Sequence, residues 1–193
     1  MEYVLGCPTY HFYTKRVDES GIWSTISNAD RKNQIIVCKS FKQITDSKGV
    51  VPNRSYACIS CHEFKDHKIF KMRNPWGAFQ WGGEYAETSS KWNDELKREV
   101  GFIEKDEGTF YLALSEFKQY FETVHVAEYR EKFQHTGVKC KTAPNHAKLF
   151  QFEIIKDTEA SFRIHQEDIR IAAKQDNADD DQDEEGEEVA EKE

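Results

Sequence analysis

Two β-prone segments that meet at a short polar connection restrict the fold of this chain most strongly. RSYACISCHEF begins at Arg54 and HKIFKMRN ends at Asn74, with KDH where the two meet. Strand-like runs joined by so short a polar connection are typical of an antiparallel β-hairpin. The chain is therefore expected to contain an antiparallel sheet, and we place the remaining segments around this hairpin.

Local patterns along the rest of the chain predict an α+β fold, an antiparallel sheet with a few short helices. Ile22, Trp23 and Ile26 recur at helical spacing, which predicts a helix over 18–30. Short apolar or alternating runs indicate further strands, and amphipathic runs that follow a serine indicate two more helices. The further strands are expected at 34–41, 108–114 and 123–129, and the further helices at 89–101 and 115–121.

Charge is distributed unevenly between the body of the chain and its C-terminal end. The net charge is −8 at pH 7, but residues 176–193 hold 11 acids and one base, whereas residues 1–175 hold 24 acids and 26 bases. The body is therefore near neutral, and the end of the chain has too few apolar residues to build a core. We expect residues 172–193 to form an acidic disordered tail.

Composition and pattern also argue against several classes of function. A near-neutral body lacks the basic surface that phosphate binding requires, so we expect no nucleic-acid partner. No segment is long and apolar enough for a membrane span, and no signal-like pattern follows Met1, so we expect a cytoplasmic protein without a membrane partner. The five cysteines are then expected to be reduced thiols. No glycine-rich phosphate loop is present, and we expect no cofactor.

The segment CISCH, residues 58–62, matches the C-x-x-C-H spacing of haem attachment. Alternate side chains of a strand point to opposite faces, so Cys58 and Cys61 are expected to point in opposite directions. They would then reach neither one haem edge nor, with His62 and His67, one zinc ion. We therefore interpret the two thiols as packing residues on opposite faces of a strand.

The segment RNPWGAFQW, residues 73–81, places Asn74 between a strand and an aromatic cluster. Pro75 restricts Asn74 to an extended backbone. An amide held in this way beneath an indole can orient a neighbouring imidazole, as the third catalytic residue of papain-type cysteine proteases does. The alternative is an asparagine that closes a turn, and the spacing by itself favours this alternative.

The segment FKMRNPWGAFQWGGEYAETSSKW, which ends at Trp92, resembles the Asn-Pro-Trp-Gly segment of the calpain family. EYVLGCPTYHFY, NQIIVCKSF and DEGTFYLALSEFKQYFETVHVAEY are similar to other parts of the second half of the calpain protease core. KLFQFEIIKDTEASFRIHQED is similar to the hairpin that opens the following β-sandwich. The resemblance covers about residues 2–168. It implies a second half-domain of the papain-like core at 1–130, a linker at 131–147 and a β-hairpin at 148–171.

The departures from the family pattern concern catalysis. The family's nucleophile lies in Q-G-x-x-G-D-C-W, and this sequence holds no such motif. The family's histidine lies in G-H-A-Y, which corresponds here to residues 53–56, so Arg54 takes the histidine position. A guanidinium stays protonated and cannot accept a proton from a thiol. His62 lies eight residues further along, about 25 Å away in a strand, and cannot substitute. Asn74 and Trp76 would then be vestigial, and Pro75, Trp76 and Trp81 would persist because they pack the strand–loop junction.

The resemblance also implies calcium-binding positions in the core, and these are altered. Gln80 replaces a glutamate of the family pattern, Glu87 represents an aspartate, Glu107 another aspartate, and Thr109 a glutamate. Losing two carboxylates from an oxygen-ligand site weakens it severely. We therefore expect no metal in the core.

These departures predict a catalytically inactive, truncated calpain-like protein, a pseudoenzyme rather than an enzyme. We expect it to act as a structural or interaction subunit of a larger intracellular assembly. The binding surface would be the cleft-side face left exposed by the missing half-domain. A ciliary or cytoskeletal, microtubule-associated complex is the first candidate for that assembly. The alternative is a regulatory or split-protease subunit that pairs with a chain carrying the catalytic-cysteine half-domain.

Overall fold

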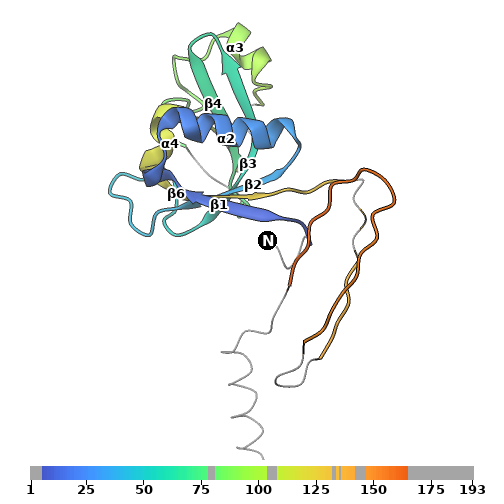
Figure 1. The fold of residues 1–193 in the computed structure, drawn as a ribbon. Coiled ribbons are helices and arrows are strands. Elements are labelled where there is room, and N and C mark those ends of the chain that lie inside the picture. Colours follow the sequence, from blue (N-terminus) through green and yellow to red (C-terminus); the bar gives the residue numbers. More distant parts are fainter. Residues whose placement is uncertain are drawn as a thin grey trace, which may run out of the picture. The chain divides into compact units, whose positions relative to one another are not determined.

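A computed structural model of the protein describes residues 6–77, 81–103, 108–131, 134, 136–141 and 147–164. The chain divides into two compact units, residues 1–140 and 141–193, and each is described by itself. In the first unit six strands form one antiparallel sheet in the order β1-β6-β2-β3-β4-β5 (Figure 1). The strands are β1 Thr9–Tyr13, β2 Ile35–Ser40, β3 Ser55–Phe64, β4 His67–Arg73, β5 Thr109–Ala113 and β6 Phe121–Ala127. The helices are η1 Thr14–Arg16, α2 Glu19–Arg31, α3 Asp94–Glu99 and α4 Leu114–Tyr120.

The hairpin that restricts the fold most strongly is confirmed as β3 and β4. Phe64 pairs with His67 at the turn, and Ala57 pairs with Arg73 at the other end. Lys65 takes a left-handed backbone with φ 53° in the connection. The α+β prediction is also confirmed, because short helices accompany an entirely antiparallel sheet of the described residues.

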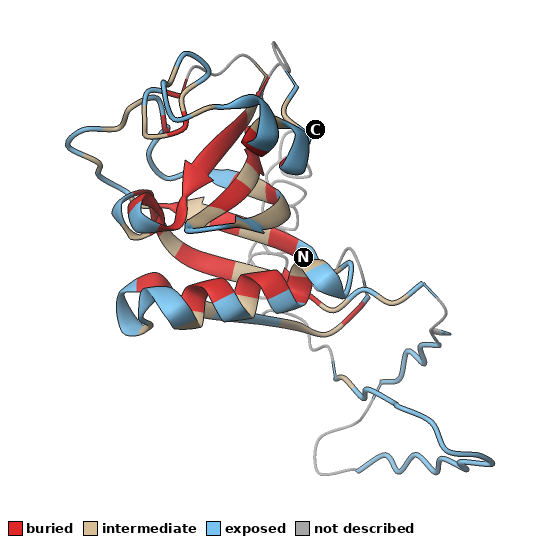
Figure 2. Cartoon of the chain, turned by 90° about the horizontal axis from the view of Figure 1, so that it is seen from above, coloured by how far each residue is buried: buried red, intermediate tan, exposed pale blue. Residues whose placement is uncertain are grey.

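Helix α2 forms where its sequence pattern predicts it. The carboxylate of Asp18 accepts a hydrogen bond from the Gly21 amide at 2.9 Å, and so caps the first turn. The buried positions of α2 lie along the side that faces the sheet, and its other side is exposed (Figure 2). This one-sided burial is the physical result of apolar residues at a helical period.

The predicted helix over 89–101 is shorter than expected, because α3 begins only at Asp94. The cap is Asn93, whose side-chain oxygen accepts a hydrogen bond from the Leu96 amide at 2.8 Å. Ser89, an expected cap, donates its hydroxyl hydrogen to the Glu84 carbonyl at 2.7 Å instead. The serine therefore belongs to the turn before the helix and does not start it.

Helices α2 and α4 cover one face of the sheet and bury the larger of two apolar clusters. Phe70, Phe117 and Phe121 lie at its centre with no exposed area, and the ring centroids of Phe70 and Phe117 are 4.9 Å apart. A smaller cluster of Ile69, Tyr85, Leu96, Val100, Tyr111 and Ala113 lies between α3 and strands β4 and β5. Ile69 and Phe70 are neighbours in β4 but belong to different clusters, because successive side chains of a strand alternate between faces.

In the second unit, the described residues 147–164 include no assigned strand, although a hairpin was predicted at 148–171. The rings of Phe152 and Phe162 lie 4.5 Å apart, on either side of the bend at residues 156–157. Leu149 and Ile155 are 96% and 92% exposed, so the two arms lack the buried face that stabilises a hairpin. Residues 165–171 and the predicted acidic tail lie outside the described part of the chain. The likeness to the start of a β-sandwich stays a prediction.

Candidate functional site

The residues expected to correspond to a catalytic site meet at one end of the sheet. Arg54 directly precedes β3, and Asn74 directly follows β4. Because Ala57 pairs with Arg73, the chain just before β3 and the chain just after β4 lie side by side. The hairpin thus brings together two positions that are twenty residues apart in the sequence.

Asn74 closes a turn and is 6% exposed. Its side-chain oxygen accepts a hydrogen bond from the Trp76 amide at 3.1 Å. Its own amide donates to the Gly108 carbonyl at 2.7 Å, and its carbonyl accepts from the Gly77 amide at 3.4 Å. The side-chain oxygen is therefore used within the turn, as the turn-closing interpretation of this asparagine predicts.

Arg54 contacts Trp76 across the end of the hairpin. The guanidinium carbon lies 5.4 Å from the centroid of the Trp76 ring, within the range of a cation–π interaction. The backbone of Arg54 is held by the buried Ser40: the Arg54 amide donates to the Ser40 hydroxyl at 2.9 Å, and the Ser40 amide donates to the Arg54 carbonyl at 2.8 Å. A fixed backbone thus presents an exposed cation beside an exposed indole.

Pro75, Trp76 and Trp81 were expected to be retained because they pack the strand–loop junction. This expectation is wrong for Pro75 and Trp76. Pro75 is exposed and Trp76 is 63% exposed, whereas Trp81 is only 6% exposed. The Trp81 ring lies 5.7 Å from Phe110 and 5.2 Å from Tyr120. The turn at Asn74 leaves the first indole exposed, whereas the second indole, Trp81, packs in the core.

The positions matched to calcium ligands are only partly described. Gln80 and Glu107 lie outside the described residues. Glu87 is exposed, and Thr109 opens β5, where it pairs with Arg73. Among the described residues no group of three or more His, Cys, Asp or Glu side chains is arranged to hold a metal ion. The expectation of no metal in the core therefore stays a prediction.

The expectation that Cys58 and Cys61 point to opposite faces is wrong. The register of β3 against β4 shifts between Cys58 and Ser60, so that Cys58 pairs with Met72 and Cys61 pairs with Phe70. Ile59 is the extra residue of this β-bulge. The side chains after it therefore point to the opposite face of the sheet from the one that regular alternation would give. Both thiols consequently contact the larger apolar cluster. His62, near the far end of β3, shares a 2.8 Å hydrogen bond with the Ser60 hydroxyl and lies far from Arg54.

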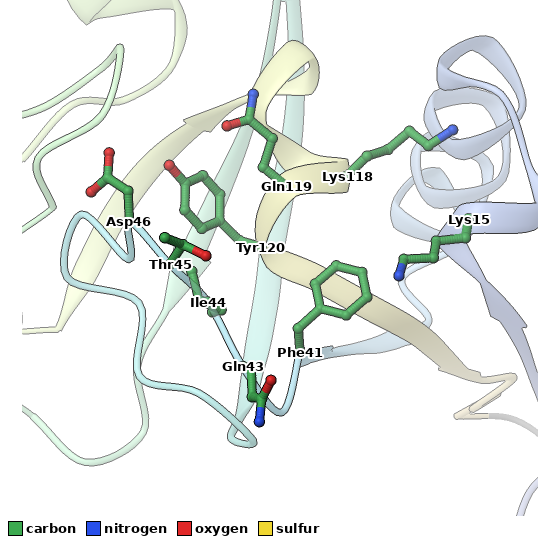
Figure 3. A pocket seen from close by; sticks show the side chains of 9 residues that line it. All are labelled: Lys15, Phe41, Gln43, Ile44, Thr45, Asp46, Lys118, Gln119 and Tyr120. Atoms are coloured by element: carbon green, nitrogen blue, oxygen red, sulfur yellow. The ribbon is translucent and has the colours of Figure 1, made fainter.

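A hollow of about 410 Å³ lies between the loop after β2 and the end of α4 (Figure 3). It is lined by Lys15, Phe41, Gln43, Ile44, Thr45, Asp46, Lys118, Gln119 and Tyr120. The ammonium of Lys15 lies 4.7 Å from the Phe41 ring centroid, and that of Lys118 donates to the Val17 carbonyl at 2.8 Å. The lining contains no cysteine, histidine or serine, so it holds neither a Cys–His nor a Ser–His pair. Sequence patterns could not predict this hollow, because it needs segments that lie more than seventy residues apart in the chain.

No helix of the described residues has the length and apolar character needed to cross a membrane.

Comparisons with known proteins place the chain in a protein family. Residues 1–128 match the calpain family cysteine protease domain. Human calpain-7 is 26% identical over 106 residues, which are 50% of this chain and 13% of calpain-7. Rat calpain-9 is 23% identical over 139 residues, 65% of this chain and 20% of that protein. The calpain-type cysteine protease DEK1 of Arabidopsis thaliana is 27% identical over 82 residues, 42% of this chain and 4% of that protein. The chain thus spans a fifth or less of these relatives.

Proposed function

The chain belongs to the calpain family of cysteine proteases, and we propose that it is a member without peptidase activity that binds other proteins. The observation that carries this proposal is Arg54, seated over Trp76 and beside the turn of Asn74. The family resemblance gives the Arg54 position to the histidine that activates the cysteine. The proposal therefore rests on one residue whose chemistry differs in kind from that of the residue it replaces.

An arginine at this position removes the general base. Activation of a thiol requires an acceptor for its proton, and a protonated guanidinium has no lone pair to offer. The backbone bonds to Ser40 also keep the main chain of Arg54 at this position, and its guanidinium contacts Trp76. This reasoning holds whichever chain or segment supplies the cysteine.

A peptidase assay tests the inactivity directly. We expect the full chain to hydrolyse no fluorogenic peptide, with or without calcium, by itself or mixed with the first half-domain of an active calpain. Arg54→His restores the base in the same mixture, and Arg54→Gln serves as a control that removes the charge without adding a base. Activity of the wild-type chain in the mixture would show that Arg54 does not stand at the histidine position, and would refute the proposal.

The binding role is supported by the surface around the same end of the hairpin. Val51 and Trp76 are 45% and 63% exposed, and Arg54 is exposed between a strand end and an indole. Tryptophan and arginine are the residues most enriched in the energetic centres of protein interfaces. We propose that this end of the hairpin docks on a protein subunit of a larger intracellular assembly, with a ciliary or cytoskeletal complex as the first candidate.

Native purification of the endogenous protein with mass spectrometry of its companions tests the binding role. Recovery of a stable complex that is lost in the double variant Arg54→Ala, Trp76→Ala supports the proposed surface. A matched double variant on the opposite hairpin end, Lys65→Ala with Asp66→Ala, should leave the complex intact. A protein that purifies alone at physiological salt contradicts the proposal.

A second candidate function is regulatory or split-protease pairing with a chain that carries the catalytic cysteine. It is favoured by Asn74, which has the family identity and a defined position, with its side-chain oxygen 3.1 Å from the Trp76 amide nitrogen. The chain would then occupy the place of a protease's own second half-domain. Titration into an active calpain should lower its rate if this pairing occurs, and an unchanged rate across the titration removes the candidate.

A further inference from the structure

The β-bulge in β3 places two thiols next to each other on the same face of the sheet. Cys58 pairs with Met72 and Cys61 pairs with Phe70, and both partners lie in the larger apolar cluster without exposed area. Met72 and Phe70 are two residues apart in β4, so their side chains point the same way. Cys58 and Cys61 must therefore point the same way as well, although three residue steps separate them.

The separation of the two cysteines follows from this register. Three residue steps of β3 cover the length of two steps of β4, which is about 7 Å between α-carbons. This is close to the upper end of the range that a disulfide bridges without large backbone movement. The Cys58 thiol donates a weak hydrogen bond to the Ser60 carbonyl, with 3.9 Å between sulfur and oxygen, and all of the described cysteines are free thiols.

The two thiols differ in their access to solvent. Cys58 is 7% exposed, whereas Cys61 is partly exposed at the edge of the apolar cluster. The Cys61 amide donates to the carboxylate of Asp30, near the end of α2, at 2.8 Å. Of the two cysteines, Cys61 is therefore the more accessible to a small oxidant from solvent.

We propose that Cys58 and Cys61 form a reversible intrachain disulfide when the protein meets a peroxide. The sulfur of Cys61 attacks a peroxide oxygen, the O–O bond breaks, and Cys61 becomes a sulfenic acid while water leaves. The sulfur of Cys58 then attacks that of Cys61, the S–O bond breaks, and a second water carries away the oxygen and the proton. Two thiols are oxidised by two electrons, and one hydrogen peroxide is reduced to two waters.

The surroundings make Cys58 the resolving thiol and not the one attacked first. The neighbouring Cys61 side chain and burial raise the pKa of the Cys58 thiol well above its ordinary value, so it stays protonated until its neighbour has reacted. Burial raises the pKa of Cys38 on the adjacent strand in the same way, and Cys38 stays a bystander. The reaction is therefore expected to be slow and to need a sustained excess of peroxide.

Closing the bond changes the sheet at the bulge. The β-carbons of a disulfide lie closer together than two side chains spaced along a strand, so the bulge has to tighten around Ile59. Tightening moves the Cys61 amide relative to Asp30, and so couples the oxidation state to the end of α2. A strained bond of this kind has a high reduction potential and is reopened by glutathione.

Peptide mapping of the full chain tests the proposal. After treatment with hydrogen peroxide, remaining thiols are alkylated and the protein is cleaved with trypsin, which places Cys58 and Cys61 together in the peptide 55–65 and leaves Cys38, Cys7 and Cys140 in other peptides. We expect peptide 55–65 to become lighter by two hydrogens and to lose both alkylation sites. Reduction by glutathione should restore both sites.

Matched variants separate the pair from its neighbours. Cys140→Ser, at an exposed position, should leave the effect unchanged, whereas Cys61→Ser should abolish it. Three results would overturn the proposal: peptide 55–65 that keeps both alkylation sites, Cys61 that accumulates as sulfinic acid while Cys58 stays alkylatable, or a cross-link between peptides 55–65 and 33–39. The wild-type map decides among these outcomes even if a serine variant fails to fold.

Discussion

Arg54 lies over the ring of Trp76, with its guanidinium carbon 5.4 Å from the ring centroid, where β3 begins and β4 has just ended. The contact joins the residue that we propose to take the family's histidine position to the indole that follows Asn74. Both side chains are exposed, so the end of the hairpin presents a cation and an aromatic ring to solvent. A cation beside an exposed aromatic ring is a combination suited to binding.

The contact between Arg54 and Trp76 should be measurable but weak. Arg54→Ala is expected to lower the free energy of unfolding by less than about 1 kcal/mol, because cation–π pairs at exposed sites contribute little. The same change should reduce the quenching of tryptophan fluorescence by iodide, since a cation that attracts the anion beside Trp76 is lost. Arg54→Lys keeps the charge and should keep most of the iodide quenching. Equal quenching of all three proteins would show that the contact is not formed.

Asn74 should stabilise the turn and not serve only as a remnant of catalysis. Asn74→Ala leaves the Trp76 amide without its acceptor and is expected to lower the free energy of unfolding by about 1–2 kcal/mol in urea titrations. Asn74→Asp keeps an oxygen acceptor at the same place and should cost less. If alanine and aspartate destabilise the protein equally, the hydrogen bond to Trp76 is not the source of the effect.

Gly108 should be required because two backbone carbonyls approach its α-carbon. A β-carbon added there would lie 2.8 Å from the Asn74 carbonyl oxygen and 2.9 Å from that of Gly77, and its φ is +86°. Gly108→Ala is expected to cost more than about 2 kcal/mol, by strain and by displacement of the Asn74 turn. Gly101→Ala is the matched control, because Gly101 has φ +59° and nothing within 4 Å of the added atom. If Gly108→Ala lowers the free energy of unfolding no more than Gly101→Ala does, Gly108 does not lie close to the carbonyls of Asn74 and Gly77.

Glu116 should hold three segments together through one buried carboxylate. Glu116 is 7% exposed. Its carboxylate accepts a hydrogen bond from the Glu84 amide at 3.0 Å and forms a salt bridge with the Lys48 ammonium at 3.4 Å. Glu116→Ala leaves that amide unpaired and is expected to cost about 2–3 kcal/mol in thermal or urea unfolding. Glu116→Gln keeps an acceptor oxygen and should recover part of the loss. Lys48→Met should cost less than Glu116→Ala, because the side chain of Lys48 is 36% exposed.

Acidification should weaken the protein through His125. Burial, with smaller contributions from His11 and Lys39, holds the pKa of His125 below its ordinary value of 6.5. The unfolded chain then binds a proton more readily than the folded chain, so stability is complete above pH 6.5 and is lost as the pH falls from there toward the lower folded value. We expect a loss below about 1 kcal/mol, because His125 is only partly buried. His125→Gln should reduce the decrease in the free energy of unfolding between pH 7 and pH 5. A variant whose free energy of unfolding decreases as steeply with falling pH as that of the wild type would contradict the prediction.

Local sequence patterns were sufficient to predict those elements that are stabilised mainly by residues close together in the chain. The spacing of Ile22, Trp23 and Ile26 predicts α2, because a helix with one apolar face can bury it in only one way. The hairpin of β3 and β4 follows from two β-prone runs and a connection too short for any other pairing. The prediction for 148–171 differs: its apolar runs resemble a hairpin, but side chains such as Leu149 and Ile155 stay exposed in the described residues.

The sequence by itself determined the antiparallel hairpin, the main helix and the chemical identities at positions 54 and 74, since these depend on residue type and on spacing along the chain. Only the tertiary structure decided which side chains face one another. An extra residue at Ile59 reverses the alternation of β3, so that Cys58 and Cys61 lie on one face, and the turn at Asn74 exposes Trp76 while Trp81 is buried. A bulge or a turn depends on how a segment fits its neighbours, and the period of the segment alone does not contain that information.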